Sequence, residues 1–194
     1  FDWTRTQLDK PLADGSTALV YYKDQLEKMD PLTGELSLPG WDASYKKEDL
    51  RALFEAYGRL NEEDLWENLR YFLEAVIPVA EESGVNMAIH PDDPPWNIFG
   101  LPRIITCEAN LDRFLKLVDS PANGLTLCIG SLGCAASNDI YRMIDKYAAQ
   151  GRIHFMHVRN VKILPDGGFE ESAHFSACGS LDIAVSYTPL TLPT

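Results

Sequence analysis

Apolar side chains recur in this sequence at two spacings, and each spacing predicts a kind of secondary structure. Leu50, Leu53 and Tyr57 follow the three- and four-residue steps of a helix, whereas the segment from Val85 to His90 is short and largely apolar, as in a buried strand. Applied along the chain, the pattern predicts helices over 46–57, 62–83, 109–118 and 137–149. It predicts strands over 85–90, 124–128 and 152–158.

From residue 85 onward the predicted elements alternate between strand and helix, which favours an α/β fold with a parallel sheet. Residues 6–45 do not follow this order, because prolines and glycines interrupt a single short apolar run. We expect this segment to be an irregular insertion or lid near the N-terminus. Residues 184–194 match no helical or strand pattern, and they resemble a read-through of a sequencing-library adapter. We therefore expect one partial β/α-barrel domain over 1–183, followed by a non-native tail.

Composition narrows the choice of partner and compartment. A formal net charge of −12 repels nucleic-acid backbones and anionic lipid surfaces, so we expect no nucleic-acid partner and no membrane association. No apolar stretch approaches the roughly 20 residues of a membrane span. The four cysteines form no CxxC pair, which favours a reducing, cytoplasmic setting. At 194 residues the chain is shorter than the roughly 250 residues of a full β/α barrel.

Each predicted strand ends on a residue that can bind a metal ion. His90, Cys128 and His157 close the three strands, at separations of about 38 and about 29 residues, near the length of one strand-helix-strand unit. Because successive parallel strands end at the same edge of a sheet, we expect these side chains to point at one place. The pattern predicts a metal site at the mouth of a β/α barrel, and hence an enzyme.

Each of these residues also has a structural interpretation when it is considered alone. A single histidine is more often part of the packing than a ligand, and a buried free cysteine is usually an inert small apolar side chain. Asp92 and Asp93, just after His90, are alternative oxygen ligands, substrate contacts or turn formers. His154 alternates with His157 along the strand, so we expect a structural role for it. A set of two histidines and one cysteine indicates a transition metal without specifying which.

Two further residues are candidates for contact with a substrate. Arg159 follows His157 closely and could hold a carboxylate between its two guanidinium prongs, although a surface ion pair is equally compatible with the sequence. His174 lies in the polar segment 169–174 and is either a substrate contact or a solvent-exposed side chain.

Several stretches together resemble one known family, the mannonate dehydratases. The stretches are residues 1–6, 90–103, 128–133, 157–162 and 179–182, and the resemblance runs from residue 1 to about 183. It implies a TIM barrel of the xylose-isomerase-like kind and a divalent Mn(II) or Fe(II) ion. It also implies conversion of D-mannonate to 2-keto-3-deoxy-D-gluconate in hexuronate (glucuronate) breakdown.

The same resemblance assigns roles to individual residues. It implies that His90, Cys128 and His157 are the metal ligands, and it makes Arg5, Arg159 and Asn160 candidates for orienting the substrate. The sequence departs from the family at Ile129, where relatives commonly carry Thr. A later Pro-Asp-His-Gly-Arg segment of the family, which brings the fourth ligand and a neighbouring histidine, has no counterpart here.

These departures leave the function partly open. We expect a chain truncated at both ends, with its general acid and base unassigned and with little or no turnover. A sugar isomerase or epimerase on the same barrel, and a non-catalytic fragment that binds a metal or a sugar acid, are the alternatives. A homo-oligomer is possible, but no residue pattern specifies an interface.

Overall fold

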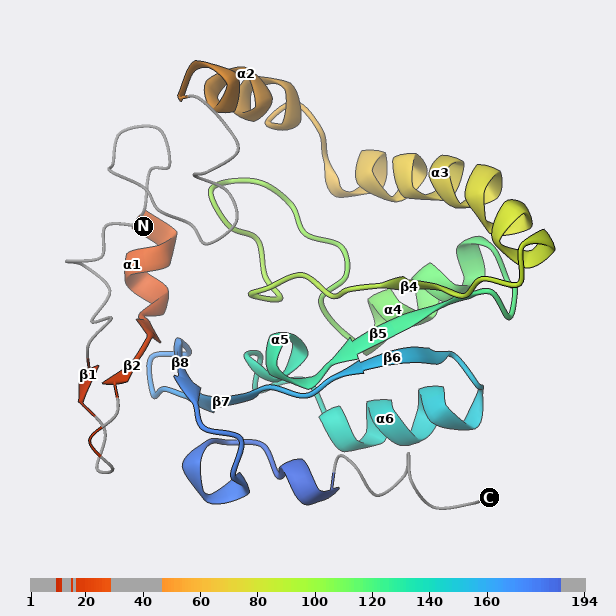
Figure 1. Cartoon of the computed structure of the whole chain (residues 1–194). Coiled ribbons are helices and arrows are strands. Elements are labelled where there is room, and N and C mark those ends of the chain that lie inside the picture. Colours follow the sequence, from red (N-terminus) through yellow and green to blue (C-terminus); the bar gives the residue numbers. More distant parts are fainter. Residues whose placement is uncertain (1–9, 12–14, 16, 29–46, 186–194) are drawn as a thin grey trace.

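The computed structural model describes residues 10–11, 15, 17–28 and 47–185. Most of the chain after residue 86 forms two small sheets and the helices around them (Figure 1). The helices are α1 (Lys23–Lys28), α2 (Lys47–Tyr57), α3 (Glu62–Glu82), α4 (Glu108–Leu117), α5 (Ile129–Gly133), α6 (Ile140–Ala149) and the 3-10 turn η1 (Ser176–Cys178). The strands are β1 (Lys10–Pro11), β2 (Thr17–Ala18), β3 (Val20–Tyr21), β4 (Met87–Ile89), β5 (Asn123–Cys128), β6 (Ile153–His157), β7 (Asn160–Ile163) and β8 (Phe169–Ser172).

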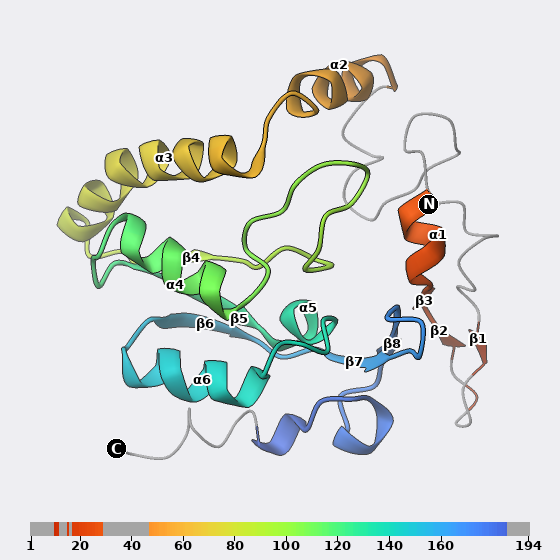
Figure 2. The same ribbon diagram turned by 180° about the vertical axis from the view of Figure 1, so that it is seen from behind.

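A parallel sheet in the order β4-β5-β6 forms the centre of the structure. Every residue of the central strand β5 is buried, as expected for a parallel strand covered by helices. Helices α4 and α6 lie across the same face of this sheet (Figure 2). Their buried residues Phe114 and Tyr147 join Leu125 and Leu127 of β5 in one apolar core. This arrangement is the strand-helix-strand-helix-strand unit that the sequence predicts.

The alignment of β5 with β6 depends on the small size of Gly124. A side chain at this position would lie 2.4 Å from the ring of His154, so only glycine leaves room for that ring. The Nδ1 atom of His154 lies 2.7 Å from the carbonyl oxygen of Met87, on the far side of β5. A register shift follows Leu125, after which Cys128 pairs directly with His157. These contacts support the structural role expected for His154.

A second, antiparallel sheet in the order β3-β8-β7 joins the early part of the chain to its later part. Val20 of β3 pairs with Glu170 of β8, about 150 residues away in the sequence. Glu170 is buried and forms ion pairs with Lys10 and Lys162, so its charge is compensated. The segment expected to be an irregular insertion thus contains three short strands and α1 within its described residues.

The predicted helices and strands are confirmed, with end points that differ by at most three residues. The α/β class is confirmed, but the expected partial TIM barrel is not: the described residues contain a three-stranded parallel sheet and no closed barrel. Strands β7 and β8 and the short helix α5 were not predicted. Each is too short, or too mixed in polarity, to produce a periodic apolar pattern. None of the described helices is both long and apolar enough to cross a membrane.

Helix α3 begins with a reciprocal cap that should contribute measurably to stability. The side chain of Asn61 accepts a hydrogen bond from the Asp64 N–H, and the Asp64 carboxylate accepts one from the Asn61 N–H. We predict that Asn61→Ala lowers the free energy of unfolding by about 1 kcal/mol, because the Asp64 N–H loses its partner. Urea titration followed by circular dichroism measures this change. Asn61→Asp keeps an acceptor and should lose less than half as much; equal losses would contradict the capping role.

Candidate metal centre

Three side chains from the ends of the parallel strands meet at one point. His90 follows β4, Cys128 ends β5 and His157 ends β6. One ligand atom from each residue lies within 4.8 Å of the other two. Because parallel pairing places Cys128 opposite His157 and brings β4 alongside β5, the three strand ends share one edge of the sheet. The structure brings together the three residues that the sequence pattern singles out.

The ring of His90 is oriented by the backbone that follows it. Its Nδ1 atom lies 2.7 Å from the carbonyl oxygen of Pro91, so we assign the ring proton to Nδ1, which donates to that oxygen. The Nε2 atom then carries the lone pair, and it lies 3.3 Å from Nδ1 of His157. A hydrogen bond with Cys128 is the main cause that raises the pKa of His90. A histidine whose second nitrogen is held by a carbonyl is typical of a metal ligand.

Cys128 is a buried thiol held among hydrogen-bond donors. Burial alone would raise its pKa, but the interaction with His90 and the hydrogen bonds from the Ser131 hydroxyl and N–H lower it overall. The Ser131 Oγ lies 3.0 Å from the sulfur and the Ser131 nitrogen lies 3.4 Å from it. Cys134, six residues further along, differs because burial raises its pKa and its thiol donates to the Gly130 carbonyl. Of these two buried cysteines, only Cys128 has surroundings that favour the thiolate.

The donor set and its spacing fit a divalent transition metal. Ions of this class bind imidazole nitrogen and thiolate sulfur at about 2.0–2.3 Å, so ligand atoms of one site lie within roughly 4.5 Å of each other. The observed limit of 4.8 Å therefore needs only small side-chain adjustments. His90 and His157 are exposed while Cys128 is buried, so the cluster is open to solvent on one side. Among the described residues, no fourth histidine, cysteine or carboxylate joins this cluster.

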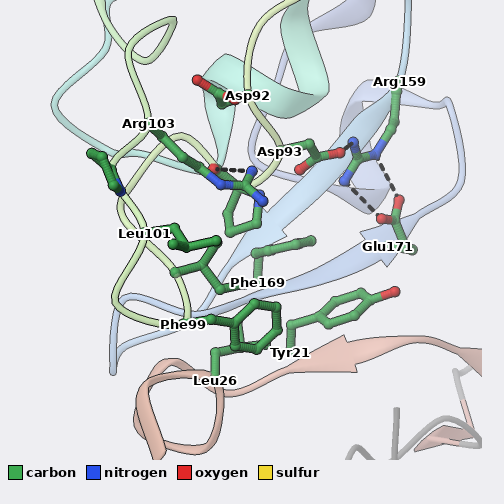
Figure 3. Close-up of a pocket in the computed structure, with 13 residues that line it drawn as sticks. Tyr21, Leu26, Asp92, Asp93, Phe99, Leu101, Arg103, Arg159, Phe169 and Glu171 are labelled. Atoms are coloured by element: carbon green, nitrogen blue, oxygen red, sulfur yellow. Dashed lines mark hydrogen bonds and ion pairs between the residues drawn. The ribbon is translucent and has the colours of Figure 1, made fainter. Parts of the chain in front are cut away.

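A cavity of about 460 Å³ lies next to this cluster, between the loop after β4 and the antiparallel sheet (Figure 3). Its charged centre is Arg159, which forms ion pairs with Asp93 and Glu171. Burial would lower the pKa of Arg159, but these two carboxylates raise it overall. Gly130 makes room for the arginine, because a side chain there would lie 2.7 Å from Arg159 Cγ. Arg159 is therefore a permanent cation in the cavity wall.

A second arginine lines the opposite part of the cavity. Arg103 donates from Nη1 to the carbonyl oxygen of Pro94, 3.0 Å away, and no described carboxylate lies within ion-pair distance of it. Burial lowers its pKa, while the nearby charges of Asp92 and Asp93 act in the other direction. The Asp92 carboxylate is held by the N–H groups of Ile104 and Ile105. Arg103 thus keeps donors that point into the cavity (Figure 3).

The remaining candidates from the sequence have different surroundings. Asn160 is fully buried; its amide donates to Ala173 and Phe175 carbonyls and its oxygen accepts from the Leu181 N–H. It therefore holds the chain around η1 together and does not reach the cavity or the cluster. His174 is exposed and its Nε2 lies 3.1 Å from the Val158 carbonyl oxygen, so it lies near the end of β6. Arg5 lies outside the described residues.

Several residues of this site could not be selected from the sequence. Glu171 and Tyr21 reach the cavity only because β8 and β3 pair across the chain. Arg103 is 13 residues beyond His90, at the end of a loop without periodic pattern. For Asp93 the sequence leaves three roles open, as an oxygen ligand, a substrate contact or a turn former, and its position three residues after a strand-end histidine is the signal that favours a place in the site.

Comparisons with known proteins agree on one family. A sequence profile described as D-mannonate dehydratase (UxuA) matches residues 1–189. Mannonate dehydratase 2 of Halalkalibacterium halodurans is 56% identical over 183 residues, which cover 94% of this chain and 53% of that protein. Mannonate dehydratase of Streptococcus agalactiae serotype V is 53% identical with the same coverage. The chain spans about half the length of these curated relatives.

A solved structure shows the same likeness in three dimensions. The crystal structure of mannonate dehydratase from Streptococcus suis serotype 2 superposes with a TM-score of 0.83 at 46% sequence identity, covering 98% of this chain and 50% of that one. Because the sequence profile covers nearly the whole chain and the structural match agrees with it, the family assignment rests on both sequence and fold. The chain belongs to the D-mannonate dehydratase (UxuA) family.

Proposed function

We propose that this chain carries the metal-binding residues of an enzyme that removes water from D-mannonate to give 2-keto-3-deoxy-D-gluconate in hexuronate breakdown. The observation that carries the proposal is the convergence of His90, Cys128 and His157 within 4.8 Å, in a chain of the D-mannonate dehydratase family. The adjoining cavity supports it, since its arginines and carboxylates offer hydrogen-bond partners to a polyhydroxylated acid.

His90 Nε2, the Cys128 thiolate and His157 Nδ1 would hold the metal, for which we propose Mn(II) or Fe(II). A bound divalent ion supplies a Lewis acid that polarises the substrate carboxylate and makes the proton on C2 more acidic. The Pro91 carbonyl oxygen accepts a hydrogen bond from His90 Nδ1, which leaves the lone pair on Nε2 free for a metal. The hydrogen bond from the Ser131 hydroxyl favours the thiolate form of Cys128. Neighbouring residues thus favour the metal-binding form of two of the three ligand atoms, His90 Nε2 and the Cys128 sulfur.

The elimination also needs a base for the C2 proton and an acid for the leaving 3-hydroxyl. Arg159 is the proposed substrate-orienting residue, because it lies two positions after His157 and its guanidinium is held in the cavity wall by Asp93 and Glu171. We assign no acid–base pair. For that reason we expect turnover by this chain to be far below that of a relative such as the Halalkalibacterium enzyme.

The free cysteines also support a proposal about location. Cys107, Cys128, Cys134 and Cys178 form no disulfide, and Cys128 must stay reduced to bind a metal. We propose that the protein works in the reducing cytoplasm, with a small sugar acid as its partner.

The metal assignment can be tested by changing one cysteine at a time. We predict that Cys128→Ala lowers the affinity for Mn(II) by at least about 100-fold, because one of three ligands and the only thiolate are lost. Isothermal titration with Mn(II) measures the affinity and the stoichiometry. Cys178→Ala is the matched control, since Cys178 is exposed and outside the cluster, and it should bind as the parent does. Unchanged stoichiometry in Cys128→Ala would remove Cys128 from the site.

The reaction class can be tested from the product and not only from the rate. We predict that the Mn(II)-loaded chain binds D-mannonate and, over long incubation at high protein concentration, forms traces of a product that lacks one water. Mass spectrometry of the product measures this directly. A product of unchanged mass would instead favour a sugar isomerase or epimerase. Failure to bind D-mannonate, or turnover as fast as that of the Halalkalibacterium relative, would contradict the proposal as stated.

A further inference from the structure

Strand β6 does not present the same set of alternate residues to the helices along its whole length. Ile153 and Met156 both pack against the apolar core, and they pair with Leu125 and Leu127 of β5. In a regular strand successive side chains point to opposite faces, so two residues three positions apart cannot share a face. One extra residue therefore lies between Ile153 and Met156.

The pairing with β5 identifies the extra residue as His154. Leu125 pairs with Ile153, but the next residue of β5, Thr126, pairs with Phe155, so the register passes over His154. This is a β-bulge, in which two residues of one strand lie opposite one residue of its neighbour. Bulges are rare between parallel strands, and they are frequent beside active sites, where they redirect a side chain.

The bulge decides on which face of the sheet His157 lies. Beyond it, Phe155 is 59% exposed on the face away from the core, and His157, on that same face, pairs with Cys128. With regular pairing from Leu125 onward, Cys128 would pair with Met156, and His157 would point toward the core. Without the bulge the strand would therefore bring a thioether, in place of an imidazole, to the candidate metal centre.

The side chain of His154 is anchored on the other side of the central strand. Its Nδ1 atom lies 2.7 Å from the Met87 carbonyl oxygen of β4, so we assign a proton to Nδ1, which donates to that oxygen. The ring passes over β5 at Gly124, where a side chain would lie only 2.4 Å from it. The glycine supplies the space and the carbonyl supplies the partner, so one side chain ties the bulge of β6 to β4.

We propose that His154 is a positioning residue for the metal ligand His157: by anchoring the bulge to Met87 across Gly124, it turns His157 toward Cys128. The proposal rests on the proposed metal site and extends it to a residue outside the ligand cluster. The hydrogen bond to β4 favours the bulged register over the regular one, and only the bulged register places both ligands on one face. His154 thus acts on the metal through His157.

Replacing the ring tests the hydrogen bond. Zn(II) is the probe, because it binds imidazole and thiolate more tightly than Mn(II) does and so keeps weakened variants measurable. His154→Leu keeps a side chain of moderate size without a donor, and it should lower the Zn(II) affinity by at least about tenfold in isothermal titration. His154→Asn has an amide nitrogen in the place of Nδ1 and should stay within about threefold of the parent. Equal losses in the two variants, or no loss in either, would overturn the role of the hydrogen bond.

A double-mutant cycle separates positioning from a general loss of stability. In a chain that already carries His157→Ala, adding His154→Leu should lower the Zn(II) affinity by less than about twofold, because the side chain that His154 positions is gone. A loss as large as in the parent would show that His154 does not act through His157. Asn61→Ala is the stability control, since it removes the cap of α3 and should leave the Zn(II) affinity within about twofold. A tenfold loss in Asn61→Ala would mean that lowered stability alone explains the effect.

The register itself can be measured without a metal. In the metal-free parent, nuclear Overhauser contacts between backbone protons should place Cys128 beside His157. In His154→Leu, the contacts of Cys128 should move to Met156 or be shared between Met156 and His157, and an unchanged pattern would overturn the proposal. If the parent binds neither Zn(II) nor Mn(II), the metal site and this proposal fail together. If the parent binds Zn(II) and His154→Leu binds it equally well, only this proposal fails.

Discussion

The parallel pairing of β4, β5 and β6 is the constraint on which the site depends. Parallel strands leave the sheet at the same edge, so whatever residue ends each strand is brought to one place. The pairing of Cys128 with His157 results from the register between β5 and β6, and that register needs a glycine at position 124 where the His154 ring lies. A contact in the middle of the sheet thus decides whether two candidate ligands face each other at its edge.

The loops beyond that edge are joined by partly exposed ion pairs. Arg159 joins Asp93, from the loop after β4, to Glu171 of β8, and it reaches Ser131 in α5. Because the guanidinium is largely shielded from solvent while its two carboxylates are about one third exposed, these ion pairs favour the closed arrangement of the loops by a modest amount. Arg159 therefore has two roles: it joins loops that are distant in the sequence, and it forms part of the cavity wall.

Much of the α/β layering could be predicted from the sequence, because the spacing of apolar residues in long helices such as α3 and α6 indicates which face is buried. The three strand-end residues could be selected for the same reason. The antiparallel sheet could not, since β3 and β8 are two and four residues long and pair over a long separation. Helix α5 could not be predicted either, because it is only five residues long; its first turn is capped by the Cys128 sulfur.

By itself the sequence determined which residue types end each strand and how far apart they lie, because both follow from local periodicity and chain length. It also determined the family, through motifs that the comparisons confirm. Only the tertiary structure decided that Asn160 is buried and holds the chain around η1 by hydrogen bonds, and that Arg159 forms ion pairs with both Asp93 and Glu171. Those roles depend on burial and on partners that are distant in the chain. A local sequence pattern does not specify which distant residues come into contact, so these roles could not be predicted from it.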